Sequence, residues 1–256
     1  MDTKIIYEQP LNERIRVLLR LEFLFAQAAQ HLHDDSQWGS RNTLNSLLEI
    51  LSIFGRTDLK TEVLKELERH SMTLAKLEPN PDIDQSRLKQ ILSELEKLGG
   101  ELHKSGGPIA AALKENEFLS SIQQRGAIPG GTCDFDLPGY HFWLQQPAKR
   151  RTRDLAAWLG HFENIAQAIK LILRLIREST CFKSVTAESG FYQITLDPNH
   201  PCQLVRVAVD DTIPCYAEIS GGRHRVTVRF MELSKQDSHA KQAVRNVSFD
   251  LECCVI

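Results

Sequence analysis

Basic residues alternate with apolar ones in the segment RHRVTVRF, residues 223–230. In a β-strand, alternate side chains share a face, so the arginines gather on one face and the apolar residues on the other. The basic face holds Arg223, Arg225, Thr227 and Arg229. The core face holds His224, Val226, Val228 and Phe230, all of which we expect to pack inward. Because arginine forks bind carboxylates through paired hydrogen bonds, the basic face suits an extended acidic peptide.

Two other interpretations of this face stay open. It is also compatible with a solvated strand face, balanced by acids on neighbouring strands such as Glu218 or Glu232. A track for nucleic-acid phosphates is the third, but we expect no aromatic residue on this face, as stacking on single-stranded bases would require. The formal net charge of −2 also argues against a general nucleic-acid binder, so no nucleic-acid partner is expected.

A second basic cluster, KRRTR at residues 149–153, begins a predicted helix. Basic residues at a helix N-terminus oppose the macrodipole and cost about 0.3–1 kcal/mol each. The cluster is therefore not expected to stabilise its helix. A solvated helix start fits it, and so does a phosphate-binding role, which would make the chain a nucleic-acid-binding regulator that uses KRRTR and the arginine strand.

Motifs for catalysis are missing from the sequence. It holds no P-loop, no GxGxxG opening a helix after a strand, no GxSxG and no HExxH. We therefore expect no enzyme, no catalytic residues and no cofactor. An enzyme with an unrecognised site would need a titrating cleft residue that the sequence does not indicate.

The six cysteines form no CxxC pair and no zinc-ligand spacing, so buried, reduced thiols are expected and no metal site. The N-terminus lacks the apolar core of a signal peptide, and no run of eighteen apolar residues is long enough to span a membrane. We expect a cytoplasmic protein without membrane insertion.

The first two thirds of the chain show helical periodicity. Helices are predicted over about residues 11–32, 39–54, 59–77, 84–98 and 148–180, with two short ones within 104–126. Thr57 or Asp58 caps the third helix and Asp84 the fourth, which Gly99 and Gly100 end. The helix at 11–32 has two apolar sides, so its own fold buries both or a dimer partner covers one.

From residue 179 onward the hydrophobic period changes to alternation. Six strands are predicted, within residues 181–188, 190–196, 202–210, 215–220, 223–233 and 244–256. The fold class is therefore α+β, with a mainly helical domain at 1–178 followed by an antiparallel β-domain at 179–256. Residues 127–147 are expected to form short strands or an ordered loop that joins the β-domain.

Several ordered segments resemble the ZapD family of bacterial cell-division proteins. They are YEQPLNERIRVLLRLEFLF, RTDLKTEVLKELERH, IPGGTCDFDLP, GFYQ and ISGGRHRVTVRFM, and together they extend from Tyr7 to about Cys254. The resemblance implies a non-enzymatic, cytoplasmic homodimer that binds the acidic and apolar C-terminal tail of FtsZ at the mid-cell division ring. A dimer with two tail sites would crosslink FtsZ filaments into bundles.

The resemblance also implies which basic residues bind the tail. The matching positions are Arg56, Arg125, Arg225 and Arg229. We add Arg223 from strand parity and charge, and Lys183 from its charge and neighbourhood. The family pattern leads us to expect a further basic residue in LKENEF, where this chain has Asn116 and Glu117 and only Lys114 is basic.

Overall fold

The computed structural model of the chain describes residues 3–56, 58–222, 224–233 and 239–255. It divides into two compact units, of which one joins Met1–Leu18 to Leu173–Ile256 and the other spans Leu19–Ile172. Helices are followed by antiparallel sheets along the chain, which confirms the α+β class. Within the described ranges, no helix combines the length and the apolar character that a membrane crossing requires.

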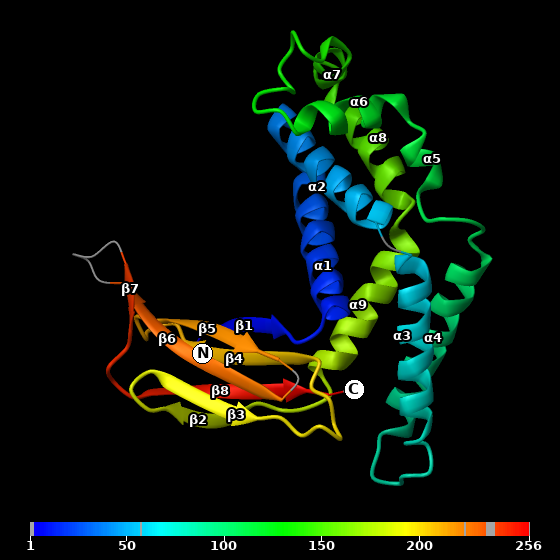
Figure 1. Cartoon of the computed structure of the whole chain (residues 1–256). Coiled ribbons are helices and arrows are strands. Elements are labelled where there is room, and N and C mark those ends of the chain that lie inside the picture. Colours follow the sequence, from blue (N-terminus) through cyan, green and yellow to red (C-terminus); the bar gives the residue numbers. More distant parts are fainter. Residues whose placement is uncertain (1–2, 57, 223, 234–238, 256) are drawn as a thin grey trace. The chain divides into compact units, whose positions relative to one another are not determined.

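The helices lie in the first two thirds of the chain (Figure 1). They are α1 Glu13–Leu32, α2 Gln37–Arg56, α3 Leu59–Ala75, α4 Gln85–Lys104, α5 Ala111–Lys114, α6 Glu117–Gly126, α7 Pro138–Leu144, α8 Ala148–Gly160 and α9 Glu163–Arg177. The Asp58 side chain accepts the Thr61 N–H at the start of α3, and Asp84 accepts two N–H groups at the start of α4. Both predicted caps are therefore confirmed. Figure 1 shows α3 and α4 side by side as an antiparallel hairpin.

Two predicted helix boundaries are wrong. Helix α4 runs through Gly99 and Gly100 to Lys104, because burial of Leu102 outweighs the glycine penalty of about 1 kcal/mol per residue. The helix predicted at 148–180 is two helices, α8 and α9. The chain turns after Gly160, and Phe162 is buried at the turn, where its ring packs against the ring of Phe54.

The prediction of strands within residues 127–147 is also wrong. This segment forms a series of turns followed by helix α7, whose first residue is Pro138. Proline is suited to the first helical position because its φ is already helical and its missing N–H is not needed there. Tyr140, Trp143 and Leu144 are buried on one side of α7, while Phe142 is 65% exposed. The apparent alternation of apolar residues was a short amphipathic helix.

The other unit contains two antiparallel sheets (Figure 1). Their strands are β1 Lys4–Pro10, β2 Lys183–Ala187, β3 Phe191–Thr195, β4 Leu204–Asp210, β5 Tyr216–Gly221, β6 Arg225–Leu233, β7 Ala240–Gln242 and β8 Val247–Cys254. Sheet A has the order β1-β4-β8-β2, and sheet B has the order β3-β6-β5 with β7 also paired to β6. The six predicted strands are confirmed, whereas β1 and β7 were not foreseen. Strand β1 pairs with β4 from Lys4↔Asp210 to Pro10↔Leu204, although its residues were assigned to the helical domain.

The hydrophobic core of this unit lies between the two sheets. Sheet A contributes alternate residues of β4 and β8, and sheet B contributes alternate residues of β6. Val226, Val228 and Phe230 are fully buried, as strand parity predicts, and the rings of Phe230 and Phe249 lie 4.9 Å apart. The opposite parity of β6 therefore places its arginines on the outer face of sheet B.

Candidate functional site

The candidate site is the outer face of sheet B, which we call the arginine face. Strand β6 contributes Arg225, Thr227 and Arg229 in its centre. Register places Thr195, Gln193 and Phe191 of β3 opposite these three residues, in that order. On the other side, Ser220 and Glu218 of β5 lie opposite Thr227 and Arg229. Both arginines are exposed, and neither makes an ion pair with another residue in the part of the chain that the structure describes.

The two arginines have different neighbours. Arg229 lies between Phe191 and Glu218, so one acid faces it at the cross-strand spacing of about 4.5–5.5 Å between Cβ atoms. Arg225 lies between Thr195 and Gly222, whose N–H donates to the Arg225 carbonyl at 3.0 Å. No acid faces Arg225, so the positive charge at this end has no cross-strand compensation.

A shallow open hollow occupies the Arg225 end of the arginine face. Three hydroxyl residues, two glycines and two basic residues line it, namely Thr195, Ser220, Thr227, Gly221, Gly222, His224 and Arg225. His224 precedes β6 and is exposed, so the prediction that it packs in the core is wrong. Strand parity does not govern a residue outside the strand, and the His224 carbonyl instead accepts the Leu196 N–H at 2.9 Å.

Sequence analysis missed an aromatic residue, Phe191, on this face. Phe191 is 38% exposed and lies directly across from Arg229. The expectation that no aromatic residue shares this face is therefore wrong, because the register between β3 and β6 brings the Phe191 ring to the same face as Arg229. The alternation in GFYQIT, whose Tyr192 and Ile194 pack against the core, was the available signal.

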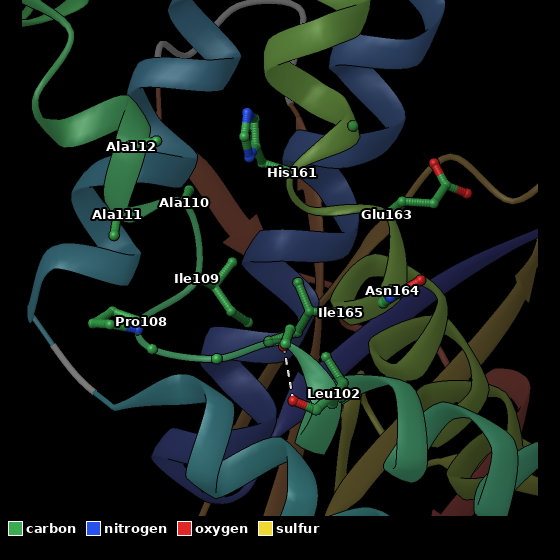
Figure 2. Close-up of a pocket in the computed structure, with 14 residues that line it drawn as sticks. Leu102, Pro108, Ile109, Ala110, Ala111, Ala112, His161, Glu163, Asn164 and Ile165 are labelled. Carbon is green, nitrogen blue, oxygen red and sulfur yellow. Dashed lines mark hydrogen bonds between the residues drawn. The ribbon is translucent and has the colours of Figure 1, made fainter.

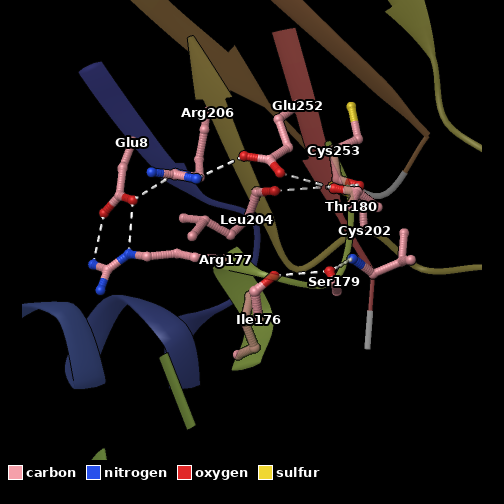
Figure 3. Close-up of polar contacts among 11 residues, drawn as sticks. Glu8, Ile176, Arg177, Ser179, Thr180, Cys202, Leu204, Arg206, Glu252 and Cys253 are labelled. Atoms are coloured by element: carbon pink, nitrogen blue, oxygen red, sulfur yellow. Dashed lines mark hydrogen bonds and ion pairs between the residues drawn. The ribbon is translucent and has the colours of Figure 1, made fainter. Parts of the chain in front are cut away.

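The outer face of sheet A differs because its charges are internally paired (Figure 3). Arg206 of β4 donates to Glu8 of β1 at 3.0 Å and to Glu252 of β8 at 2.7 Å. Arg177 at the end of α9 binds both carboxylate oxygens of Glu8, at 2.8 and 2.9 Å. Glu252 is only 3% exposed and also accepts a hydrogen bond from the Thr180 hydroxyl. These arginines form ion pairs with acids of the same unit, so little of their charge is available to a partner.

Lys183, the first residue of β2, does not share the arginine face. It has the parity of Val185 and Ala187, which pack toward the core between the sheets, and its register partner is the core residue Leu251. Lys183 is exposed because it lies at the strand end. Arg223, predicted on the arginine face, lies outside the described residues.

The two predicted site residues of the helical unit are Arg56 and Arg125. Arg56 is the last residue of α2, and its side chain is outside the described part of the chain. Arg125, near the end of α6, is exposed and has its Nη1 atom 3.9 Å from the Asp136 carboxylate. Lys114 lines a shallow hollow together with Gly55, the residue before Arg56.

The KRRTR cluster contains one structural residue. Arg151 is buried, and its guanidinium donates to Ser40 Oγ at 2.9 Å and to the carbonyls of Asp35, Leu144 and Gln146. These contacts join Arg151 to residues outside α8, a tertiary role that the sequence analysis did not foresee. Lys149, Arg150 and Arg153 are exposed.

The six cysteines are all free thiols. The prediction of buried thiols is confirmed for Cys254 and wrong for Cys181, which is exposed. Burial raises the pKa of the Cys254 thiol to about 12. Interaction with the Cys253 thiol and burial raise the pKa of Cys202.

A further hollow in the helical unit lies against the start of α9 (Figure 2). Small and apolar residues form most of its wall. Its titratable lining residues, His161 and Glu163, point away from each other in Figure 2. It therefore offers no adjacent pair of groups for acid–base chemistry. Among the described residues, no group of three or more His, Cys, Asp or Glu side chains is arranged to hold a metal ion.

Comparison with known proteins gives a consistent result. A family model described as ZapD, cell division protein, matches residues 19–229. A protein named cell division protein ZapD from Methylococcus capsulatus is 42% identical over 256 residues, covering all of both chains. Relatives of the same name from Coxiella burnetii and Dechloromonas aromatica are 38% identical over 255 residues and 39% identical over 250 residues. The first match covers 99% of each chain, and the second covers 98% of this chain and 99% of its relative.

Proposed function

We propose that this chain, which belongs to the ZapD family of cell division proteins, binds the C-terminal tail of FtsZ through the arginine face. Family membership gives the chain a role in cell division, and the relatives carry the name of a division protein, not of an enzyme. As a homodimer, it crosslinks FtsZ filaments into bundles at the mid-cell division ring in the cytoplasm.

The observation that carries this proposal is the contrast between the outer faces of the two sheets. On sheet A, Arg206 has two carboxylate partners within 3.0 Å. On sheet B, Arg225 and Arg229 are exposed and make no ion pair with a described residue. Exposed arginines that are not engaged in the fold suit an incoming carboxylate, because the guanidinium fork binds it bidentately.

The remaining basic residues of the proposed site have weaker support. Arg56 and Arg125 are assigned to the site because of the family resemblance, and Arg223 is assigned to it because of strand parity. Lys183 is exposed in the same unit as the arginine face but on another surface, so we assign it at most an electrostatic role in attracting the tail.

Bundling requires a second tail site, and we propose that a second copy of the chain supplies it. One apolar side of α1 is buried by the chain itself at Leu21 and Leu24. The other side of α1 lines an apolar groove together with α9, formed in part by Phe25, Ala29, Leu32, Phe162 and Ile169. A second subunit seated there would cover this groove and give the bivalency that makes weak tail contacts effective.

Co-sedimentation with FtsZ filaments tests the proposal. Arg225→Glu should abolish binding and bundling while the circular dichroism spectrum and the dimer mass stay unchanged. Arg150→Glu is the matched control, because Arg150 is exposed and its side chain donates to Gln146 on the preceding turn. This variant should bundle filaments as the wild type does. Wild-type bundling by Arg225→Glu would contradict the proposal.

A further inference from the structure

The arginine face has two chemically different ends. At the Arg225 end the neighbouring side chains are short and hydroxylated, and they line the hollow described above. The Thr227 hydroxyl donates to the Ser220 carbonyl at 3.3 Å, so it is held at the surface beside Arg225. A guanidinium with hydroxyl groups around it and no facing acid is suited to an oxyanion such as a carboxylate.

The Arg229 end combines charge compensation with apolar surface. Glu218 lies opposite Arg229 on one side, and the exposed ring of Phe191 lies opposite it on the other. Two residues further along β6, Met231 faces Tyr216 of β5, and both are half-buried. We call Phe191, Tyr216 and Met231 the apolar shelf.

Glu218 decides what this end can accept. A carboxylate approaching Arg229 would also approach Glu218 and meet repulsion from a like charge. An apolar side chain meets no such penalty, and it gains by covering the exposed ring of Phe191. The attraction of Arg229 for acids is therefore weaker than that of Arg225, although both are exposed arginines on one strand.

We infer that the arginine face reads a two-part pattern, with a carboxylate of the bound peptide at Arg225 and an apolar side chain on the shelf around Phe191. Arg225 and Arg229 are four residues apart on β6, which is about 13–14 Å at a rise of about 3.4 Å per residue. An extended peptide therefore presents the two groups about four residues apart. Phe191 is thus a specificity-determining residue, and Glu218 excludes a second acid from the shelf. The inference rests on the proposed function, since it names what the same face selects in the tail.

A binding experiment with the full-length protein tests this pattern. The probe is a fluorescein-labelled peptide with the sequence of the FtsZ C-terminal tail, together with versions in which one acidic residue is changed to its amide or one large apolar residue to alanine. Fluorescence anisotropy gives the dissociation constant at several salt concentrations for wild type, Arg225→Gln, Arg229→Gln, Phe191→Ala and Glu218→Gln. Val244→Ala is the control for loss of an exposed apolar side chain elsewhere in the same unit.

The expected effects differ between the two ends. Arg225→Gln should weaken binding by about tenfold to a hundredfold and reduce its salt dependence, because a charge-assisted contact is lost. Arg229→Gln should weaken binding by about threefold or less, because the facing carboxylate of Glu218 already offsets part of the positive charge of Arg229. Phe191→Ala should weaken binding by about fivefold to tenfold without changing the salt dependence, and Val244→Ala should have no effect.

Paired changes in protein and peptide identify the contacts. The losses of binding free energy caused by Phe191→Ala and by one apolar-to-alanine change in the tail should not add up, because both changes remove the same contact. The same should hold for Arg225→Gln and one acid-to-amide change about four residues away in the tail. Glu218→Gln should tighten binding of a tail version that carries aspartate at the apolar position.

The outcomes separate the two claims. If wild-type protein does not bind the tail peptide, the proposed function and the inference both fail. If it binds but Phe191→Ala behaves like Val244→Ala, or both arginines couple equally to acids, only the two-part pattern is overturned.

Discussion

Replacing His70 by leucine should flatten the pH dependence of stability between pH 7 and pH 5. His70 lies on α3 and is fully buried in the hairpin of α3 and α4. Its Nδ1 atom has no hydrogen-bond partner in the described part of the chain, and its Nε2 atom lies 3.4 Å from the Arg69 guanidinium. Burial, followed by the positive charge of Arg69, lowers the pKa of His70 to about 4.

The sign and size of the effect follow from proton linkage. In the unfolded chain a histidine titrates near pH 6.5, so between about pH 6.5 and pH 4 the unfolded state binds a proton that the folded state does not. The contribution of neutral His70 to the unfolding free energy is therefore fully present above pH 6.5 and is lost as the pH falls toward 4. At about 1.4 kcal/mol per pH unit, moving from 6.5 to 5 removes about 2 kcal/mol of unfolding free energy.

Urea unfolding of the full chain at pH 7 and pH 5, followed by circular dichroism, measures this difference. His70→Leu should lose about 2 kcal/mol less than wild type over that interval, because leucine has no proton to bind. The same substitution at His141, an exposed residue of α7, is the matched control. Equal pH dependence of the unfolding free energy in wild type and His70→Leu would show that the pKa of His70 is not lowered, since the buried ring would then titrate as it does in the unfolded chain.

Three further predictions concern the scaffold and the proposed dimer. Arg206→Gln should destabilise the chain by about 3–5 kcal/mol in urea unfolding, because it leaves buried Glu252 without its cation, and a loss under about 1 kcal/mol would contradict the ion-pair assignment. Arg151→Ala should lower the unfolding free energy by at least about 2 kcal/mol, whereas Arg150→Ala should lower it by no more than about 0.5 kcal/mol. Equal losses for the two variants would show that the buried hydrogen bonds of Arg151 do not stabilise the fold. Ala29→Glu, in the groove of α1 and α9, should convert the proposed dimer to a monomer in light scattering, and a dimer that persists would show that the subunits associate through another surface.

Features that depend on neighbouring residues were predictable from the sequence. The Asp58 and Asp84 caps were correct because a cap is defined within one turn of helix. The six strands were found because alternation is also local. The parity of Val226 and Val228 followed directly, and with it the exposure of the arginines.

Features that depend on distant pairing were not predictable in this way. Strand β1 joins its sheet only through β4, about two hundred residues away in the sequence, and nothing near residue 4 marks that partner. The α7 segment shows the opposite error, since its alternating apolar residues are equally compatible with one short helix that begins at Pro138. Glycines inside α4 were overridden by tertiary burial of Leu102.

The site shows the same division. Sequence parity placed Arg225 and Arg229 on one exposed face of the strand, but the register of β3 and β5 was needed to place Phe191 and Glu218 beside Arg229. The same kind of information removes Arg206 from consideration, because its acids come from β1 and β8. Charge alone would not separate a structural arginine from one available to a partner.

Nuclear magnetic resonance of the isotope-labelled full chain, titrated with the FtsZ tail peptide, is the most direct test of whether the tail binds the arginine face. We expect chemical-shift changes concentrated on the arginine face, including the guanidinium signals of Arg225 and Arg229, while the guanidinium signal of Arg206 stays unchanged. Shifts confined to the outer face of sheet A, with the Arg225 and Arg229 signals unmoved at saturating peptide, would show that the tail binds elsewhere.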